Sequence, residues 1–376
     1  MAMIVFATVP QIGHLNAPLK LAKSLASRGH QICYLSDLRY KNYIEEQGLR
    51  FIAPGESLDL LERLLNFRFH DRPFDDQIAR DLEVLRQEIT TLVQTLKPDL
   101  FLIDPYIPDI ALITHQLGMP YVFLNPTLFN PLVGTLFNEA PYLASVPELV
   151  LCPAEFDFPD TAARNKQRYY LGPEVDLQRK EDPFDWEKID ATKPLIYCSL
   201  GTQAQVYSET KRIFPIIIEA LSGLPQYEMI VATGRNVDHE FLQHVPPNVH
   251  LFSYVPQSQV LAKATVLITH GGLLTVKDGI FFGVPMIVFP GLYDQPQNSG
   301  RVVYHGLGVK GDMRSTTVDQ VRALIQKVIQ TPSYRERVLE FGTMFRQRDE
   351  AGISVKVVEA LLASLKRTHK KTANQN

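Results

Sequence analysis

The strongest constraint on the fold is an alternation of short apolar runs with amphipathic segments, which occurs in both halves of the chain. In the segment Leu15–Arg28, apolar residues recur at the spacing of one helical face, and Gly29 follows as a helix stop. The alternation begins again at Leu195. Short apolar strands separated by helices are typical of parallel sheets that are covered on both faces. The sequence therefore predicts an α/β protein with two doubly wound, Rossmann-like domains.

The expected elements follow this alternation from end to end. Strands are predicted at Met3–Ala7, Ile32–Ser36, Phe51–Ala53, Asp99–Ile103, Tyr121–Leu124, Leu195–Ser199, Met229–Ala232, Val249–Phe252, Val266–Thr269 and Met286–Phe289. Helices are predicted at Leu15–Arg28, Gln77–Leu96, Pro108–Leu117, Glu209–Leu221 and Ile353–Lys366. Because open α/β sheets bind ligands at the carboxyl ends of their strands, the residues directly after the strands are the candidates for a site.

The domain boundary is expected in a polar stretch, Pro173–Lys193, that contains prolines and many acidic residues. We expect an N-terminal domain over residues 1–180, a linker over 181–193, a C-terminal domain over 194–350, and a helix with a polar tail over 351–376. Two such domains joined by one linker predict a cleft between them. The last helix can pack on either domain.

Composition excludes several classes of function. The net charge of −3 argues against nucleic acid as a partner, because phosphate binding requires a surplus of Lys and Arg. The cysteines Cys33, Cys152 and Cys198 lack metal-ligand spacing and fit a reducing compartment. No signal peptide is recognisable, and no apolar stretch approaches the roughly 20 residues that a spanning helix requires. We expect a cytoplasmic protein, which a lipid-like substrate could bring to a membrane surface.

The densest motif is His270-Gly271-Gly272, followed by Thr275, at the end of a predicted strand. Two glycines at a strand-to-helix turn let a ligand approach the backbone and the positive end of the helix dipole. That arrangement suits a diphosphate, with Asp278 one turn further on as an acceptor for a ribose hydroxyl. A tight turn that only packs a helix on the sheet is the alternative.

Further polar and aromatic residues follow the neighbouring strands. A carboxylate beside an amide, as in Asp294-Gln295, is suited to hold sugar hydroxyls, although Asp294 could simply cap a helix. Tyr254 offers a face on which a base could stack, unless it is a core aromatic residue. Weaker candidates for nucleotide contacts are Ser199, Gly201, Thr202, Val255 and Gln257.

The first half supplies a candidate general base. His14 follows the first strand and Gly13, and a histidine is suited to proton transfer near neutral pH. Asp104 follows another strand of the same predicted sheet and could fix the tautomer of the imidazole. A histidine at a helix start can also be only a cap or a packed ring.

These residues carry a resemblance to family 1 glycosyltransferases, the UDP-glycosyltransferase superfamily of the GT-B fold. The motifs occur in the family's order: Gly13-His14, His270-Gly271-Gly272 with Thr275, Gly283-Val284-Pro285, Pro290, and Asp294-Gln295 with Asn298. Within the family, the runs Asp294-Gln295-Pro296 and Arg301–Gly308 most resemble bacterial zeaxanthin glucosyltransferases, with macrolide glycosyltransferases the next group.

The resemblance implies an inverting, metal-independent transfer of a hexose, expected to be glucose, from a UDP-sugar to a hydroxyl of a small apolar acceptor. A carotenoid-, polyketide- or lipid-like acceptor is expected, with no cofactor besides the donor. His14 would be the general base and Asp104 the carboxylate that orients it. The donor would be bound by Ser199, Gly201, Thr202, Tyr254, Val255, Gln257, His270, Gly271, Gly272, Thr275, Asp278, Asp294 and Gln295.

Three departures from the family pattern concern the donor: Tyr254 stands where Trp is common, Asp278 where Glu is common, and Leu274 where Asn or Gly is common. They leave uridine or thymidine open as the base. For the acceptor, Phe123 and Phe129 belong to an apolar stretch, 123–137, that could line a pocket or belong to the core. A nucleotide-sugar epimerase, a lipid-linked sugar transferase and a non-catalytic nucleotide-sugar binding subunit are the alternative functions on this fold.

Overall fold

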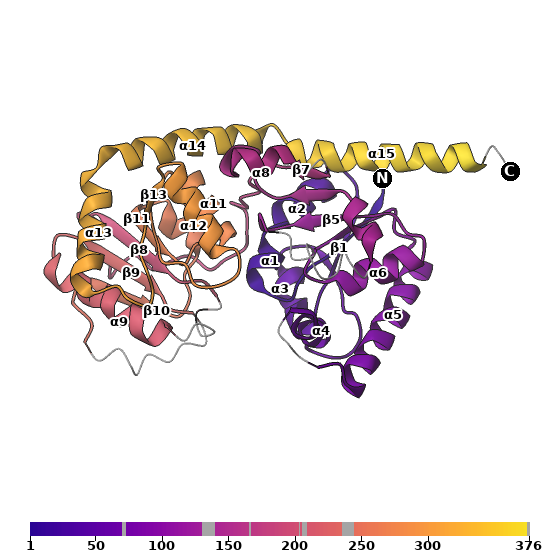
Figure 1. Ribbon diagram of the computed structural model, residues 1–376, viewed down its shortest axis with the longest axis horizontal. Coiled ribbons are helices and arrows are strands. Elements are labelled where there is room, and N and C mark those ends of the chain that lie inside the picture. Colours follow the sequence, from indigo (N-terminus) through magenta and orange to yellow (C-terminus); the bar gives the residue numbers. More distant parts are fainter. Residues whose placement is uncertain are drawn as a thin grey trace. The chain divides into compact units, whose positions relative to one another are not determined.

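The computed structural model describes residues 1–69, 73–129, 140–164, 167–202, 204, 209–234 and 244–373. The chain forms two compact units, each built around its own sheet (Figure 1). The first unit contains Met1–Glu155, Pro159–Lys180 and Ala351–Asn376, and the second contains Phe156–Phe158 and Glu181–Glu350.

The first unit has a parallel sheet of seven strands. Their order is β3 (Arg50–Ile52), β2 (Gln31–Leu35), β1 (Met3–Ala7), β4 (Leu100–Ile103), β5 (Tyr121–Asn125), β6 (Glu148–Val150) and β7 (Arg168–Tyr170). Its helices are α1 (Ile12–Asn16), α2 (Leu19–Ser27), α3 (Lys41–Glu46), α4 (Leu60–Phe69), α5 (Asp76–Leu96), α6 (Pro108–Gln116), α8 (Pro159–Arg164) and α15 (Ile353–Ala373).

Both faces of this sheet are covered, as the continuous apolar strands predict. Alternate residues of β1 enter two different cores. Val5 packs with residues of α4, α5 and α6, whereas Ile4 packs with residues of α2 and α15. The helix α15 supplies Val358 and Leu362 to the second of these cores, so the end of the chain completes the unit in which the chain begins.

The second unit has a parallel sheet of six strands. Their order is β10 (Val249–Phe252), β9 (Glu228–Ala232), β8 (Leu195–Ser199), β11 (Ala264–Thr269), β12 (Met286–Val288) and β13 (Gly308–Lys310). Its helices are α9 (Thr210–Ala220), α10 (Gln257–Leu261), α11 (Leu273–Phe281), α12 (Gln295–Tyr304), α13 (Val318–Gln330) and α14 (Pro332–Glu350). The strand order reverses direction beside the first strand in both units, which is the doubly wound arrangement that the sequence predicts.

Three details differ from the sequence-based expectations: the division of one helix, the grouping of the expected linker, and the grouping of the short segment Phe156–Phe158. The predicted helix Leu15–Arg28 is divided into α1 and α2, because Pro18 has no N–H to donate to the carbonyl of His14. Residues 181–193, expected to be a separate linker, group with the second unit. There the Phe184 N–H donates to Gln259 Oε1 at 3.0 Å, and the Phe184 ring lies 5.0 Å from that of Phe252.

The short segment Phe156–Phe158 also belongs to the second unit, although the residues on either side of it belong to the first. The Asp157 carboxylate accepts from Arg301 Nε at 2.9 Å, and the Arg301 guanidinium lies 4.8 Å from the centre of the Phe158 ring. Asp157 and Arg301 are both about 2% exposed. A buried ion pair of this kind is strongly destabilised when one partner is removed, so it fixes the segment firmly.

Candidate functional site

The first group of candidate residues lies at the carboxyl ends of β1 and β4. These two strands are neighbours with Ala7 opposite Ile103, so the residues that follow each strand come together. His14 Nδ1 lies 2.6 Å from Asp104 Oδ2. The Asp104 N–H donates to the Ala7 carbonyl at 2.9 Å, and Asp104 Oδ1 accepts from the Tyr106 N–H at 3.0 Å. The carboxylate is therefore held with one oxygen directed at the imidazole.

This bond determines which ring nitrogen can act as a base. A carboxylate accepts hydrogen bonds, so the proton of the neutral imidazole belongs on Nδ1, and Nε2 is then the basic nitrogen. Asp104 is buried, whereas the His14 side chain is 17% exposed. The Tyr106 ring packs edge-on against that of His14, with centres 5.4 Å apart. The ring thus has a fixed orientation and an accessible edge.

The pair lines a mostly apolar hollow with an empty volume of about 180 Å³ that includes open solvent. Its lining residues all belong to the first unit: Ala7, Thr8, His14, Pro18, Asp104, Leu124, Pro126 and Leu151. Apolar walls with a few polar groups are the usual character of a small-molecule site. The arrangement suits a hydroxyl carried on an apolar body.

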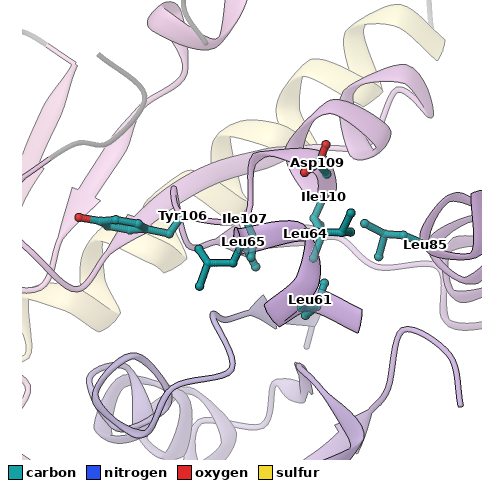
Figure 2. A pocket seen from close by; sticks show the side chains of 8 residues that line it. All are labelled: Leu61, Leu64, Leu65, Leu85, Tyr106, Ile107, Asp109 and Ile110. Carbon is teal, nitrogen blue, oxygen red and sulfur yellow. The ribbon is translucent and has the colours of Figure 1, made fainter. Parts of the chain in front are cut away.

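A second hollow has Tyr106 among its lining residues (Figure 2). It is lined by Leu61, Leu64, Leu65, Leu85, Tyr106, Ile107, Asp109 and Ile110, with an empty volume of about 190 Å³ that includes open solvent. Asp109 forms an ion pair with Arg68 at 2.5 Å and so brings no unbalanced charge. Figure 2 shows the Tyr106 ring extending away from the leucine side chains.

The predicted acceptor residues lie in different environments. Phe123 is 1% exposed and belongs to the core formed with α4, α5 and α6. It is therefore a core residue, the alternative that the sequence left open, and not part of a pocket wall. Phe129 is 40% exposed. The rest of that apolar stretch, 130–137, lies outside the described residues.

The second group of candidate residues surrounds the turn between β11 and α11. The ring of His270 lies between two glycines from adjacent strand ends: a Cβ on Gly201 would be 2.6 Å from His270 Cε1, and one on Gly272 would be 2.7 Å from Nε2. Gly201 and Gly271 also have φ angles of +86° and +90°, which L side chains rarely adopt. At Gly201, glycine is therefore required both by the close approach of the His270 ring and by the backbone conformation.

Burial lowers the pKa of His270 from its usual value to about 4, so the ring is neutral at pH 7. The neutral imidazole hydrogen-bonds the Ser199 backbone and places no charge in the turn. The N-terminal N–H groups of α11 begin directly after Gly272, and the nearly buried Thr275 lies in the first turn of this helix. The turn thus combines backbone N–H donors, a helix dipole and the Thr275 hydroxyl, which are groups suited to a phosphate.

The predicted ribose and base residues lie further along the same unit. Gln257 Nε2 donates to Asp278 Oδ2 at 2.6 Å, so the carboxylate that we predicted for the ribose is oriented by the amide. Tyr254 is 42% exposed, and its hydroxyl donates to Glu181 Oε1 at 2.5 Å. Val255 is buried. Tyr254 is thus a surface aromatic residue, not a core residue.

Asp294 and Gln295 lie at the start of α12, beside the His270 turn. The Asp294 side chain makes no capping hydrogen bond, so the simple helix-cap alternative does not account for it. Asn298 Nδ2 donates to both Asp294 Oδ2, at 2.7 Å, and the Gly271 carbonyl, at 2.9 Å. Gln295 Oε1 accepts from the Gly291 N–H at 2.9 Å. Asn298 therefore joins the predicted sugar-binding pair to the predicted diphosphate turn.

Two further residues predicted to contact the nucleotide, Ser199 and Thr202, lie at and just after the end of β8. Ser199 is 8% exposed, and its hydroxyl accepts from the Gly201 N–H at 3.4 Å, so it supports the turn that follows β8. Thr202 is exposed. In the part of the chain that the structure describes, no group of three His, Cys, Asp or Glu side chains is placed to hold a metal ion. Likewise, none of the described helices is both long and apolar enough to cross a membrane.

The comparisons with known proteins agree with this geometry. The model of the family described as UDP-glucoronosyl and UDP-glucosyl transferase matches residues 147–355, more than half of the chain. The chain belongs to this family. The resemblance inferred from the glycine-rich motifs is thereby confirmed, and the chain is a glycosyltransferase of the UDP-glycosyltransferase family.

Curated relatives of this UDP-glycosyltransferase extend over nearly its whole length. NDP-glycosyltransferase YjiC of Bacillus licheniformis is 24% identical, with 96% of this chain and 98% of the relative covered. Zeaxanthin glucosyltransferase of Pantoea ananas is 23% identical, with 94% and 95% covered. Among solved structures, the glycotransferase of kitacinnamycin matches with a TM-score of 0.78 at 24% identity, covering 97% of this chain and 99% of that one. The fold is thus GT-B, with two Rossmann-like domains.

Proposed function

We propose that this UDP-glycosyltransferase transfers a hexose, with glucose the first choice, from a UDP-sugar to a hydroxyl of a small apolar acceptor. The observation that carries the proposal is the 2.6 Å bond between His14 and Asp104 at the edge of an apolar hollow. A base fixed in one tautomer beside apolar walls is suited to deprotonate a hydroxyl on a carotenoid-, polyketide- or lipid-like molecule.

In the proposed reaction, the acceptor oxygen gives its proton to His14 Nε2 and forms a bond to the anomeric carbon. The bond between that carbon and the diphosphate oxygen breaks in the same step, so the configuration is inverted and UDP leaves with the electron pair. Asp104 stabilises the imidazolium through Nδ1. The catalytic proton transfer thus requires only one histidine and its partner carboxylate.

The second unit supports the donor side of the proposal. The N-terminus of α11, Gly272 and the neutral His270 ring can stabilise the negative charge of the leaving diphosphate. Asp278, oriented by Gln257, is assigned to the ribose, and Asp294 with Gln295 to the sugar hydroxyls. Among the structural relatives, the glycosyltransferase VinC was solved in complex with dTDP. A thymidine donor is therefore the variant to test beside the uridine donor.

The test is the release of UDP from UDP-glucose, measured with and without hydroxylated carotenoids, macrolides and naphthols. We expect release that depends on an acceptor in the wild type and that falls by about 10²–10⁴-fold in His14→Ala. His115→Ala is the matched control, because His115 is an exposed histidine of the same unit that stacks on Tyr142. Release that no acceptor stimulates, or that persists in His14→Ala, would contradict the proposal and favour an epimerase or a binding subunit.

A further inference from the structure

Thr8, one of the polar residues that line the hollow beside His14 and Asp104, has a side-chain hydroxyl with no role in the reaction described above. The hydroxyl of Thr8 makes no hydrogen bond within the described part of the chain, although Thr8 is only 3% exposed. The backbone of Thr8 is satisfied, since its N–H donates to the Leu35 carbonyl at 3.0 Å and its carbonyl accepts from Ser36 Oγ at 3.2 Å. The unsatisfied group is therefore the side-chain hydroxyl alone.

Thr8 lies beside the catalytic pair. It follows β1 directly, as Asp104 follows the neighbouring strand β4, one residue beyond the pair Ala7–Ile103. Thr8, His14 and Asp104 are the polar residues among the eight that line the hollow, and the other five are apolar. A buried hydroxyl without a partner is destabilising, and valine has the same shape without that cost. In a residue that lines the hollow beside His14 and Asp104, such a hydroxyl points to a ligand that satisfies it.

We propose that Thr8 Oγ1 forms a hydrogen bond with a second oxygen atom of the acceptor, next to the hydroxyl that reacts, so that the enzyme prefers acceptors with vicinal oxygen atoms. The inference rests on the proposed role of His14. His14 takes the proton of the reacting hydroxyl, whose oxygen then uses a lone pair to attack the sugar. A neighbouring oxygen is the group that remains for Thr8, and a threonine hydroxyl accepts a hydrogen bond from a vicinal hydroxyl or donates one to a vicinal carbonyl.

The probes are three naphthols with the same apolar body. 2-Naphthol has one hydroxyl, 2,3-dihydroxynaphthalene has a vicinal pair, and 2,7-dihydroxynaphthalene has two distant hydroxyls. We expect kcat/KM per hydroxyl for UDP release to be about 10- to 100-fold higher for the vicinal pair than for the other two, the effect of one buried hydrogen bond. Thr8→Val should abolish this preference, and Thr8→Ser should retain it.

Thr114→Val is the matched control. Thr114 belongs to α6 of the same unit, is fully buried, and has a hydroxyl that also makes no hydrogen bond within the described residues, but it does not line the hollow. Both valine variants should raise Tm by about 2–4 °C, because each removes an unsatisfied hydroxyl. Only Thr8→Val should change the preference among the naphthols. A lower Tm for Thr8→Val would show that its hydroxyl has an internal partner and would overturn the inference.

Calorimetric titration of the three naphthols, without donor, separates this inference from the proposed function. Tighter binding of the vicinal compound that is lost in Thr8→Val supports the role of Thr8, even if no UDP is released and the proposed reaction fails. Acceptor-dependent release with equal kcat/KM for the three compounds supports the reaction and overturns the role of Thr8. The role of Thr8 is also overturned if the wild type shows no selective turnover and either binds all three compounds with equal affinity or binds none of them measurably.

Discussion

Replacing Gly201 by alanine tests whether the His270 ring is held between two glycines. The new Cβ would be 2.6 Å from His270 Cε1, so the ring has to move, at a cost of about 1–3 kcal/mol for an overpacked site. The φ angle of +86° adds about 1–2 kcal/mol for an L side chain. The sum is about 2–5 kcal/mol of unfolding free energy. Because the ring is displaced, KM for UDP-glucose should rise about tenfold.

The control is Gly306→Ala in the same unit. Gly306 has a φ of +68°, but a Cβ there would meet only Arg337 Cγ at 3.7 Å, an ordinary contact. This variant should lose about 1–2 kcal/mol and keep its KM. Urea unfolding and initial-rate kinetics measure both quantities, and Gly201→Ala combined with His270→Ala should recover about 1–3 kcal/mol of the loss. Equal destabilisation by the two alanines, with unchanged KM, would refute the packing of the ring.

Three further predictions concern catalysis, pH and metal ions. Asp104→Asn should lower kcat/KM for acceptor-dependent UDP release by about 10²–10⁴-fold, because the amide N–H favours the tautomer with its proton on Nε2; retention of the wild-type rate would contradict the role of Asp104. Burial lowers the pKa of His270 to about 4, so the unfolded chain binds one more proton than the folded chain as the pH drops from 6.5 to 4, and the free energy of unfolding falls over that range. In urea unfolding, His270→Gln should remove about 2–4 kcal/mol of this pH dependence. An unchanged pH dependence would argue against a buried neutral ring. EDTA should leave UDP release unchanged, and a loss that Mg²⁺ restores would show that a metal assists the diphosphate.

The sequence was most informative where a local signal determines the structure. The apolar run Met3–Ala7 is β1 to the residue, and the helix predicted at Gln77–Leu96 is α5, which Asp75 caps by accepting from the Ile78 N–H at 2.8 Å. Elements without such signals were missed. The strands β6 and β7 have only three residues each, and a buried ion pair between Glu148 and Arg168, at 2.9 Å, joins them across the sheet. Such a pairing depends on residues distant in sequence.

The same distinction applies to the site. The rule that ligands bind after strand ends selected His14, Asp104 and His270 as candidates, because that rule depends on topology alone. It would also have identified Thr8, which directly follows the first strand, but threonine carries no strong chemical signal in a sequence. The bridge from Asn298 to Gly271 could not be predicted, since it depends on how two loops pack in three dimensions.

The membership of α15 in the first unit has a consequence for synthesis on the ribosome. Val358 and Leu362 complete a core that begins with Ile4, so more than 340 residues must emerge before the unit that starts the chain can close. Until then, the apolar side of α2 is exposed to water, a condition that promotes association with chaperones or with other nascent chains. The N-terminal half of this enzyme is therefore the first to be made and the last to be finished, and a stop codon anywhere before residue 351 deprives it of that cover.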